Sequence, residues 1–511
     1  MESARRGYFA AVNFALDVVD SAPPDRLALV ELAHDGSRRE WRFGEVADRA
    51  ARLAGTFAAH GVRRGDVVMT LIGNRPDWVC AMVACFRIGA VVLPCTEQLR
   101  AKDLRLRLDA ARPKLVLADE RNAGELTAAL ALPAAGGAAE PVVLTIPDDA
   151  LYAAEPAPAV ELAPKAPCLI TFTSGTAGEP KGVLHGQRYL AGQHVQAEHW
   201  LDARPGDLVW CTAASGWSKS ARNVFIAPWL RGAAALLHDA RFDPGERLAI
   251  LEREQVDTLC MAPTEYRLIA KRTEPRPVER LRGLVAAGEA LNPEVLRAFH
   301  EATGLWIRDG YGQTETGQMT GAPLGEAVRP GSMGRSLPGV KLWIDNGELV
   351  ANPRTVQTFF LGYLDPTRAA ASEGAGPAVE LLPASDVWRT GDRVRQDDDG
   401  FLYFEGRADD VIISAGYRIG PFEVESALVA HPAVAEAAVV AAPDEERGAI
   451  VRAVVVLRDG TAPSDALARE LQEHVKQTTA PYKHPRRVDF AAELPKTASG
   501  KVRRALLRKQ V

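Results

Sequence analysis

Residues 171–182 read TFTSGTAGEPKG and follow the short apolar run CLI. The stretch holds three glycines and four hydroxyl side chains, and Lys181 lies next to its end. Small residues let successive backbone N–H groups turn toward an anion, while hydroxyls and an ammonium group add charge-assisted hydrogen bonds. The composition therefore favours a loop that holds phosphate. Its spacing differs from that of a Walker A loop, and a solvated turn of the same composition stays open at this point.

Four further motifs lie downstream and carry residue types suited to nucleotide chemistry. They are DGYGQTETG at 309–317, RTGDR at 389–393, GRADDVIISAGYRIGPFEVE at 406–425 and PKTASGK at 495–501. The five motifs, in this order, resemble those of the adenylate-forming superfamily, which comprises acyl-CoA synthetases, adenylation domains of peptide synthetases and luciferases. The closest resemblance is to the medium-chain acyl-CoA synthetases, and it extends over nearly the whole chain.

The resemblance implies a reaction in two steps that uses ATP, Mg²⁺ and CoA. A hydrophobic carboxylic acid and Mg-ATP first give an acyl-adenylate and pyrophosphate, and the CoA thiol then displaces AMP. A free carboxylate is a poor electrophile, whereas the mixed anhydride supplies a good leaving group. The expected activity is therefore that of an AMP-forming acid–thiol ligase, an acyl-CoA synthetase.

Three of the motifs are expected to surround the nucleotide. Tyr311 lies between two glycines and suits stacking on a flat ring. Asp392 has two acceptor oxygens for the paired hydroxyls of a ribose, and Arg407 can donate to the same sugar. The ATP and AMP contacts that the resemblance implies are Thr173, Ser174, Gly175, Thr176, Gly288, Glu289, Asp309, Gly310, Tyr311, Gly312, Gln313, Thr314, Asp392 and Arg407.

Three residues are expected to act in catalysis. Glu315 replaces the last glycine of a Gly-x-Gly-x-x-Gly pattern and suits a Mg²⁺ ligand beside phosphate oxygens. Lys501 resembles the adenylation lysine of the family, which would bridge the carboxylate and the α-phosphate and offset their repulsion. Lys181 of the phosphate loop completes the set. The resemblance also implies a C-terminal domain that rotates about Asp409 as a hinge, so that Lys501 serves the first step only.

A second face of that domain is expected to bind CoA. Gly416 would let the pantetheine arm pass close to the backbone, and arginine or lysine side chains suit a phosphorylated nucleotide. The CoA contacts implied by the resemblance are Gln98, Ala415, Gly416, Tyr417, Arg418, Arg447, Tyr482 and Lys483.

The run TAASGWSKSARN at 212–223 resembles the acyl-pocket region of the medium-chain group. Gly216, Trp217 and Ser218 are the expected pocket residues, and their small neighbours leave room for a chain, a ring or a bulkier skeleton. Two cations, Lys219 and Arg222, depart from a purely aliphatic lining. Medium-chain fatty, aromatic and polycyclic acids therefore all stay open as substrates.

The pattern of elements predicts an α/β fold. Amphipathic helices alternate with short apolar strands over 41–120 and again from 169, which favours βαβ units and a largely parallel sheet. We expect a large N-terminal domain, 1–408, made of α/β subdomains and a β-rich subdomain at about 331–406. A small mobile α+β domain, 409–511, would follow. The segments 128–167 and 368–385 lack periodicity and are expected to be loose surface connections.

Composition excludes several classes of protein. The 511 residues include 61 Lys and Arg against 66 Asp and Glu, a net charge of −5, which argues against a non-specific binder of nucleic acid or anionic membranes. Six cysteines without metal-binding spacing indicate reduced thiols in a cytoplasmic protein. The most apolar stretch, 79–95, is too short for an integral membrane segment, and the N-terminus lacks a signal peptide. A homodimer stays open.

Two other functions compete with the acyl-CoA synthetase. A ligase that loads a carrier protein in natural-product biosynthesis would share the phosphate motifs, and only the CoA-contact matches favour free CoA. An amino-acid substrate is disfavoured because 212–223 lacks an aspartate to pair with an α-ammonium group. A catalytically inactive protein on the same fold is disfavoured by the presence of Lys181, Glu315, Asp392, Arg407 and Lys501.

Overall fold

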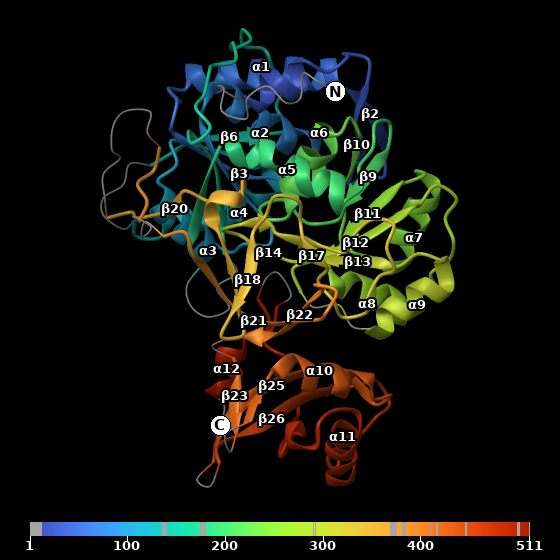
Figure 1. The fold of residues 1–511 in the computed structure, drawn as a ribbon. Helices are drawn as coiled ribbons and strands as arrows, with labels where there is room; N and C mark the ends of the chain where they lie inside the picture. The colour runs from blue at the N-terminus through green and yellow to red at the C-terminus, as the bar shows by residue number, and fades with distance from the viewer. Residues whose placement is uncertain are drawn as a thin grey trace.

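The computed structural model shows a large upper part and a smaller C-terminal part below it (Figure 1). Every structural statement below concerns the residues that it describes: 13–134, 140–173, 180–289, 291, 293–367, 376–380, 385–408, 410–414, 417–444, 447–497 and 501–509.

Two seven-stranded sheets form the frame of the large part. The first has the order β13-β12-β11-β9-β10-β1-β2, and only β2 runs antiparallel to its neighbour. The second has the order β20-β8-β7-β4-β3-β5-β6, with β8 antiparallel to both of its neighbours. The strands of the first sheet are β1 Leu27–Leu32, β2 Arg38–Arg42, β9 Leu208–Cys211, β10 Ala234–His238, β11 Thr258–Met261, β12 Gly283–Ala287 and β13 Ile307–Gly310. Those of the second are β3 Val67–Leu71, β4 Val91–Cys95, β5 Leu115–Asp119, β6 Val142–Ile146, β7 Pro167–Phe172, β8 Gly182–Gly186 and β20 Gly362–Tyr363.

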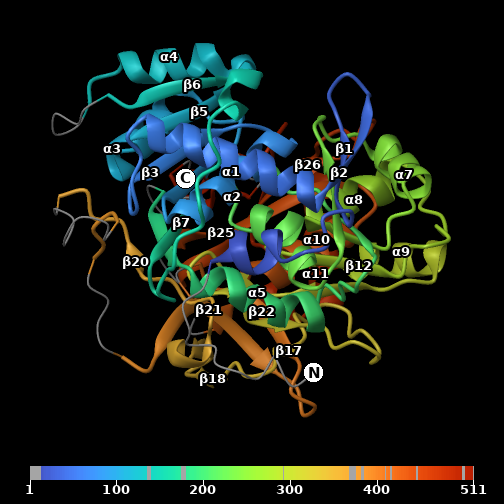
Figure 2. The same ribbon diagram turned by 90° about the horizontal axis from the view of Figure 1, so that it is seen from above.

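Helices cover both faces of each sheet, so most strands are apolar throughout. Side chains alternate along a strand: Val68 of β3 faces the core between the sheets, whereas Met69 faces the outer layer. Figure 2 shows α3 and α4 on one side of the molecule and α7 and α9 on the opposite side. The inner helices are α1 Phe43–Ala59, α2 Pro76–Ile88, α5 Arg188–His199 and α6 Ala227–Leu230, with the π-helical turns η2 Ala15–Asp20 and η6 Arg222–Ile226. The outer helices are α3 Ala101–Ala111, α4 Ala123–Ala131, α7 Pro244–Arg253, α8 Pro263–Arg272 and α9 Pro293–Thr303.

The expected alternation of helices and strands is confirmed, with one correction. The segment 128–167 is not a loose connection: β6 pairs in parallel with β5, and the 3₁₀ turn η5 Asp149–Tyr152 buries Leu151 and Tyr152. The sequence did not predict this strand because β6 lies at the edge of the sheet. Val142 and Val143 are exposed there, so the strand lacks the pattern of a buried one. Most of the second segment, 368–385, lies outside the described residues. All six cysteines are buried and unbridged, as expected.

The expected β-rich piece is a four-stranded antiparallel sheet of order β18-β19-β21-β22. Its strands are β18 Leu342–Asp345, β19 Glu348–Ala351, β21 Trp388–Gln396 and β22 Leu402–Arg407, and the short ladders before it are β14 Gly312–Gln313, β15 Gly317–Gln318, β16 Thr320–Gly321 and β17 Arg335–Ser336.

Residues from 412 onward form hydrophobic cores of their own around a three-stranded sheet, β25-β26-β27. The division of the chain at 408/409 stays a prediction. The elements here are β23 Ile412–Ser414, β24 Tyr417–Ile419, α10 Pro421–Ala430, β25 Val434–Asp444, β26 Gly448–Leu457, α11 Asp465–Thr478, β27 Arg487–Phe490 and α12 Arg504–Arg508, of which β27 and α12 were not predicted. Within the described ranges, no helix is both long and apolar enough to cross a membrane.

Replacing Trp229 of α6 tests how much the core between the sheets contributes to stability. Its ring packs against Phe43 and Phe225 with centroids 5.1 and 5.0 Å away, and its Nε1–H donates to the Ala28 carbonyl at 3.0 Å. We expect Trp229→Ala to lower the free energy of unfolding by about 3–5 kcal/mol, because a cavity and an unpaired carbonyl remain. Chemical denaturation measures the change. Trp343→Ala removes an exposed indole of β18 and should change stability by less than about 0.5 kcal/mol; equal losses in both variants would contradict this core.

Candidate active site

A cleft of about 1760 Å³ lies where the parallel strands of both sheets end. Its walls include residues one or two positions after the ends of β3, β4, β5, β9, β10, β11 and β12, and the C-terminal part closes it from the other side. Open α/β sheets bind ligands at the carboxyl ends of their strands, because polar loops gather there above an apolar core. Most of the predicted nucleotide and acyl residues line this one cleft, together with the predicted catalytic residues Glu315 and Lys501.

The predicted phosphate loop connects the antiparallel strands β7 and β8. Its two ends are tied together, since Thr173 N–H donates to the Lys181 carbonyl at 2.9 Å and Lys181 N–H donates to Thr173 Oγ1 at 3.0 Å. Ser174, Gly175 and Thr176 lie outside the described residues. The pairing of Thr173 with Lys181 brings the ends of the loop together at the edge of the cleft.

Lys181 and Glu315 both contact Tyr363, a residue that the sequence did not suggest. The Lys181 Nζ lies 4.9 Å from the centre of the Tyr363 ring, a cation–π contact, and the Tyr363 hydroxyl donates to Glu315 Oε1 at 2.8 Å. Tyr363 belongs to the two-residue strand β20, which pairs with β8 next to the loop. Its contribution depends on a pairing across roughly 180 residues that no local pattern indicates.

Asp392 is the buried centre of the nucleotide motifs. Its Oδ2 accepts the hydroxyl of Tyr311 and the Gln313 Nε2–H at 3.0 Å, while Arg407 donates to its Oδ1 at 3.4 Å. Burial raises the pKa of Asp392, and the Tyr311 hydrogen bond and the Arg407 charge partly oppose that rise. Trp388, also not predicted, fixes Gln313 by donating from Nε1 to its amide oxygen at 3.0 Å.

The ends of β12 and β13 supply the other predicted nucleotide residues. Gly288 has φ +101°, and Glu289 accepts a hydrogen bond from Thr264 Oγ1 at 2.7 Å. Burial raises the pKa of Asp309 to about 8. A Cβ on Gly312 would lie 1.9 Å from the Gly317 carbonyl oxygen, so this glycine is required by packing within the chain. Gly310 and Thr314 also line the cleft.

Lys501 reaches the cleft from the C-terminal part. Burial and the charge of Lys219 lower its pKa, whereas Glu289 and Asp392 oppose that lowering. The lysine therefore lies among the residues predicted to hold ATP, although about 110 residues separate it from Asp392 in sequence. Asp409 lies outside the described residues, and its neighbour Asp410 forms ion pairs with Arg504 and Arg508.

The predicted CoA residues are not assembled in the same way. Gln98 lines the cleft, but Tyr417, Arg447, Tyr482 and Lys483 are not among the described residues that do so. Tyr417 and Tyr482 are exposed and stack on each other with ring centres 4.4 Å apart. Two further predicted CoA residues, Ala415 and Gly416, lie outside the described residues. Of Arg418, in β24, only the backbone is described.

Two of the three predicted acyl-pocket residues, Trp217 and Ser218, line the cleft, and Gly216 precedes them in the same loop. Gly216 has φ +88°, and a Cβ there would lie 2.4 Å from the Thr96 backbone nitrogen, so the loop needs glycine. Trp217 and Ser218 follow it along the wall. Lys219 turns toward the nucleotide end, where its Nζ donates to the Ala287 carbonyl at 3.0 Å.

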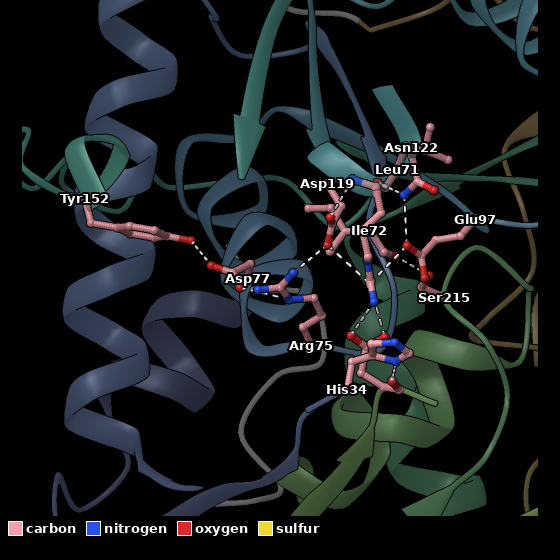
Figure 3. Close-up of polar contacts among 12 residues, drawn as sticks. His34, Leu71, Ile72, Arg75, Asp77, Glu97, Asp119, Asn122, Tyr152 and Ser215 are labelled. Atoms are coloured by element: carbon pink, nitrogen blue, oxygen red, sulfur yellow. Dashed lines mark hydrogen bonds and ion pairs between the residues drawn. The ribbon is translucent and has the colours of Figure 1, made fainter. Parts of the chain in front are cut away.

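A polar network that the sequence did not suggest joins the two sheets, and its residues line the same cleft (Figure 3). Arg121 after β5 pairs with Glu97 at 3.1 Å and with Asp239 after β10 at 3.0 Å, and Asn122 Nδ2 donates to Glu97 at 2.9 Å. Asp239 in turn contacts the His34 ring through its carbonyl at 3.3 Å. These partners lie far apart in sequence, so only the tertiary fold brings them together.

Comparison with known proteins agrees with this geometry. The family model described as "AMP-binding enzyme" matches residues 16–356, and the one described as "AMP-binding enzyme C-terminal domain" matches 423–501. The chain is 37% identical to the human mitochondrial acyl-coenzyme A synthetase ACSM4, over 98% of this chain and 90% of that protein. It is 36% identical to an uncharacterised acyl-CoA ligase, YtcI, of Bacillus subtilis strain 168, over 96% of this chain and 94% of the relative.

Solved structures lead to the same family. A Brucella canis acyl-CoA synthetase is 34% identical with a TM-score of 0.71, and the alignment covers 98% of this chain and 94% of that one. The anthranilate CoA ligase AuaEII, solved with anthranoyl-AMP, is 26% identical with a TM-score of 0.85, covering 100% and 99%. The chain belongs to the AMP-binding enzyme family.

Proposed function

We infer that this chain is an AMP-forming acyl-CoA synthetase. The observation that carries the inference is the position of Lys501, whose environment in the cleft includes Asp392 and Glu289. A carboxylate that attacks the α-phosphate of ATP brings two anions together, and an ammonium group between them lowers that repulsion in the transition state. ATP, CoA and a carboxylic acid are the substrates.

The remaining contacts suggest how ATP is held for the first step. The loop between Thr173 and Lys181 would bind the β- and γ-phosphates, and Asp392 would bind the ribose. Glu315 fits Mg²⁺, which is held by one or two carboxylates together with phosphate oxygens, and the hydrogen bond from Tyr363 orients its carboxylate. When bound, the ion would neutralise charge on the pyrophosphate that leaves.

The second step would need a different arrangement of the C-terminal part. Tyr417, Tyr482 and Lys483, the residues expected to meet CoA, stand away from the cleft while Lys501 occupies it. We propose that residues 409–511 rotate as a unit about 409–410, withdrawing Lys501 and bringing that surface to the acyl-adenylate. The ion pairs of Asp410 with Arg504 and Arg508 join the hinge to α12. A homodimer and a cytoplasmic location stay expectations from the sequence.

Lys501→Ala separates the two steps. We expect loss of ATP-dependent adenylation, measured by exchange of pyrophosphate into ATP, by at least about a hundredfold, since a preorganised charge is removed from the transition state. Thioester formation from supplied acyl-AMP and CoA should continue. Lys509→Ala, which removes an exposed lysine just after α12, is the matched control. Equal loss of both half-reactions in Lys501→Ala would contradict the rotation.

The pH dependence of adenylation tests the protonated state of Lys501. Because its pKa lies below that of an ordinary lysine, the adenylation rate should fall as the pH rises through this lowered pKa. Lys501→Arg keeps its charge over the same range, so its residual rate should lack this fall. Pyrophosphate exchange measured between pH 7 and 10 makes the comparison. If the adenylation rate of both proteins falls in the same way at high pH, a group other than Lys501 causes the fall.

Glu315→Gln tests the magnesium site. The amide keeps the shape and the acceptor for Tyr363 but removes the negative charge, so we expect the Mg²⁺ concentration for half-maximal adenylation to rise by about tenfold. Titration of MgCl₂ at constant free ATP measures the shift. Glu301→Gln, on the exposed surface of α9, serves as the control. An unchanged Mg²⁺ requirement in Glu315→Gln would exclude Glu315 as a ligand.

A further inference from the structure

Arg222 is a buried arginine in the wall of the acyl pocket. It is the first residue of the π-helical turn η6, three residues after Lys219, and only 5% of its surface is exposed. It lines the cleft together with Asn223, Cys211 and Cys260. Lys219 and Arg222 thus lie on the same wall, with Lys219 at the nucleotide end of it.

The guanidinium group lacks the partners that a buried cation needs. Its Nε and Nη1 are shielded from solvent and have no hydrogen-bond acceptor, and none of the described carboxylates forms an ion pair with it. Nearby lie the Tyr189 hydroxyl, which shares a hydrogen bond with it, and His185. Burial and the Arg222 charge lower the pKa of His185 to about 3, so this neighbour is neutral and provides no counter-charge.

Two other arginines that are equally buried have a carboxylate partner. Arg247 pairs with Glu265 at 3.5 Å and donates to His238 Nδ1 at 2.9 Å, and Arg452 pairs with Asp489. Both are 5% exposed, as Arg222 is. A buried charge without a partner is strongly destabilising, so such a group is retained where something else supplies the partner.

Asn223 adds a second unsatisfied donor beside Arg222. Its Oδ1 accepts from Gln196 Nε2 at 3.0 Å, which orients the amide, while its own Nδ2 has no partner. Both residues therefore offer N–H groups only. Such a pair suits an oxygen acceptor, and the uncompensated positive charge favours an anionic one, for which a guanidinium provides a two-pronged donor.

We propose that the acid activated by this enzyme carries a second carboxylate, at the end remote from the reacting carboxyl group, and that Arg222 with Asn223 binds it. Lys219 marks the reacting end because it touches the Ala287 carbonyl beside Gly288, whereas Arg222 lies deeper, against β8 and α5. The proposal rests on the acyl-CoA synthetase function and narrows its substrates to diacids. Arg222 is thereby a specificity residue, and it takes no part in the bond-forming steps.

The test compares each diacid with the monoacid of equal length. Straight-chain acids of four to ten carbons and benzoic acids with and without a second carboxyl group are assayed for AMP release with ATP and CoA. The wild type should prefer the diacid of at least one pair. In Arg222→Met, which keeps the length of the side chain without its charge, the diacid-to-monoacid ratio of kcat/KM should fall roughly ten- to a hundredfold. Arg297→Met, on the exposed face of α9, should keep the wild-type ratio.

A binding measurement separates this proposal from the function on which it rests. The preferred diacid should raise the unfolding temperature of the wild type in the absence of ATP, and this shift should be lost in Arg222→Met. Arg222→Met should itself unfold at no lower temperature than the wild type, because it removes an uncompensated buried charge. A wild type that prefers the monoacid in every pair would overturn the proposal. If none of the acids supports AMP release but a diacid still raises the unfolding temperature, only the enzymatic function would be overturned.

Discussion

The direction of the parallel strands is the constraint on which the rest of the structure depends. Both seven-stranded sheets pack on one core, where Trp229, Phe225 and Phe43 lie between them, and their strands end at the same cleft. The apolar faces hold the strands in place, and most of the charged groups of the cleft lie on the loops at the ends of the strands. The contact of Arg121 with Glu97 and Asp239 then fixes the two sets of loops to each other.

The chemistry proposed for the cleft depends on three charged groups that lie close together in it. Asp392, Glu289 and Lys501 lie within electrostatic reach of one another, and each changes the proton affinity of its surroundings. Water would screen such charges, but the C-terminal part closes the cleft and keeps the interaction strong. The same closure leaves Tyr417 and Tyr482 outside the cleft, which is the observation behind the proposed rotation of the C-terminal part.

Much of the fold could be predicted because strands buried on both faces read as continuous apolar runs. The strands at 67–71 and 91–95 are of this kind, and the helix at 43–59 shows helical spacing and ends before Gly61, which has φ +83°. β6 was missed since an edge strand is held mainly by backbone pairing to β5. Tyr363 and Trp388 were missed for a related reason: each acts through a partner distant in sequence.

The motifs by themselves identified the family, which the comparisons confirm, because phosphate, ribose and metal each demand particular side chains at close spacing. The nucleotide residues and the catalytic lysine that they indicate stay predictions. The sequence also showed that two cations interrupt the acyl-pocket segment. Only the tertiary structure decided what distinguishes them: Lys219 reaches a backbone carbonyl beside the nucleotide residues, whereas Arg222 is enclosed without a counter-charge. The burial of Arg222 and the absence of a carboxylate among its described neighbours both depend on elements that are distant in sequence. The local sequence therefore could not predict either of them.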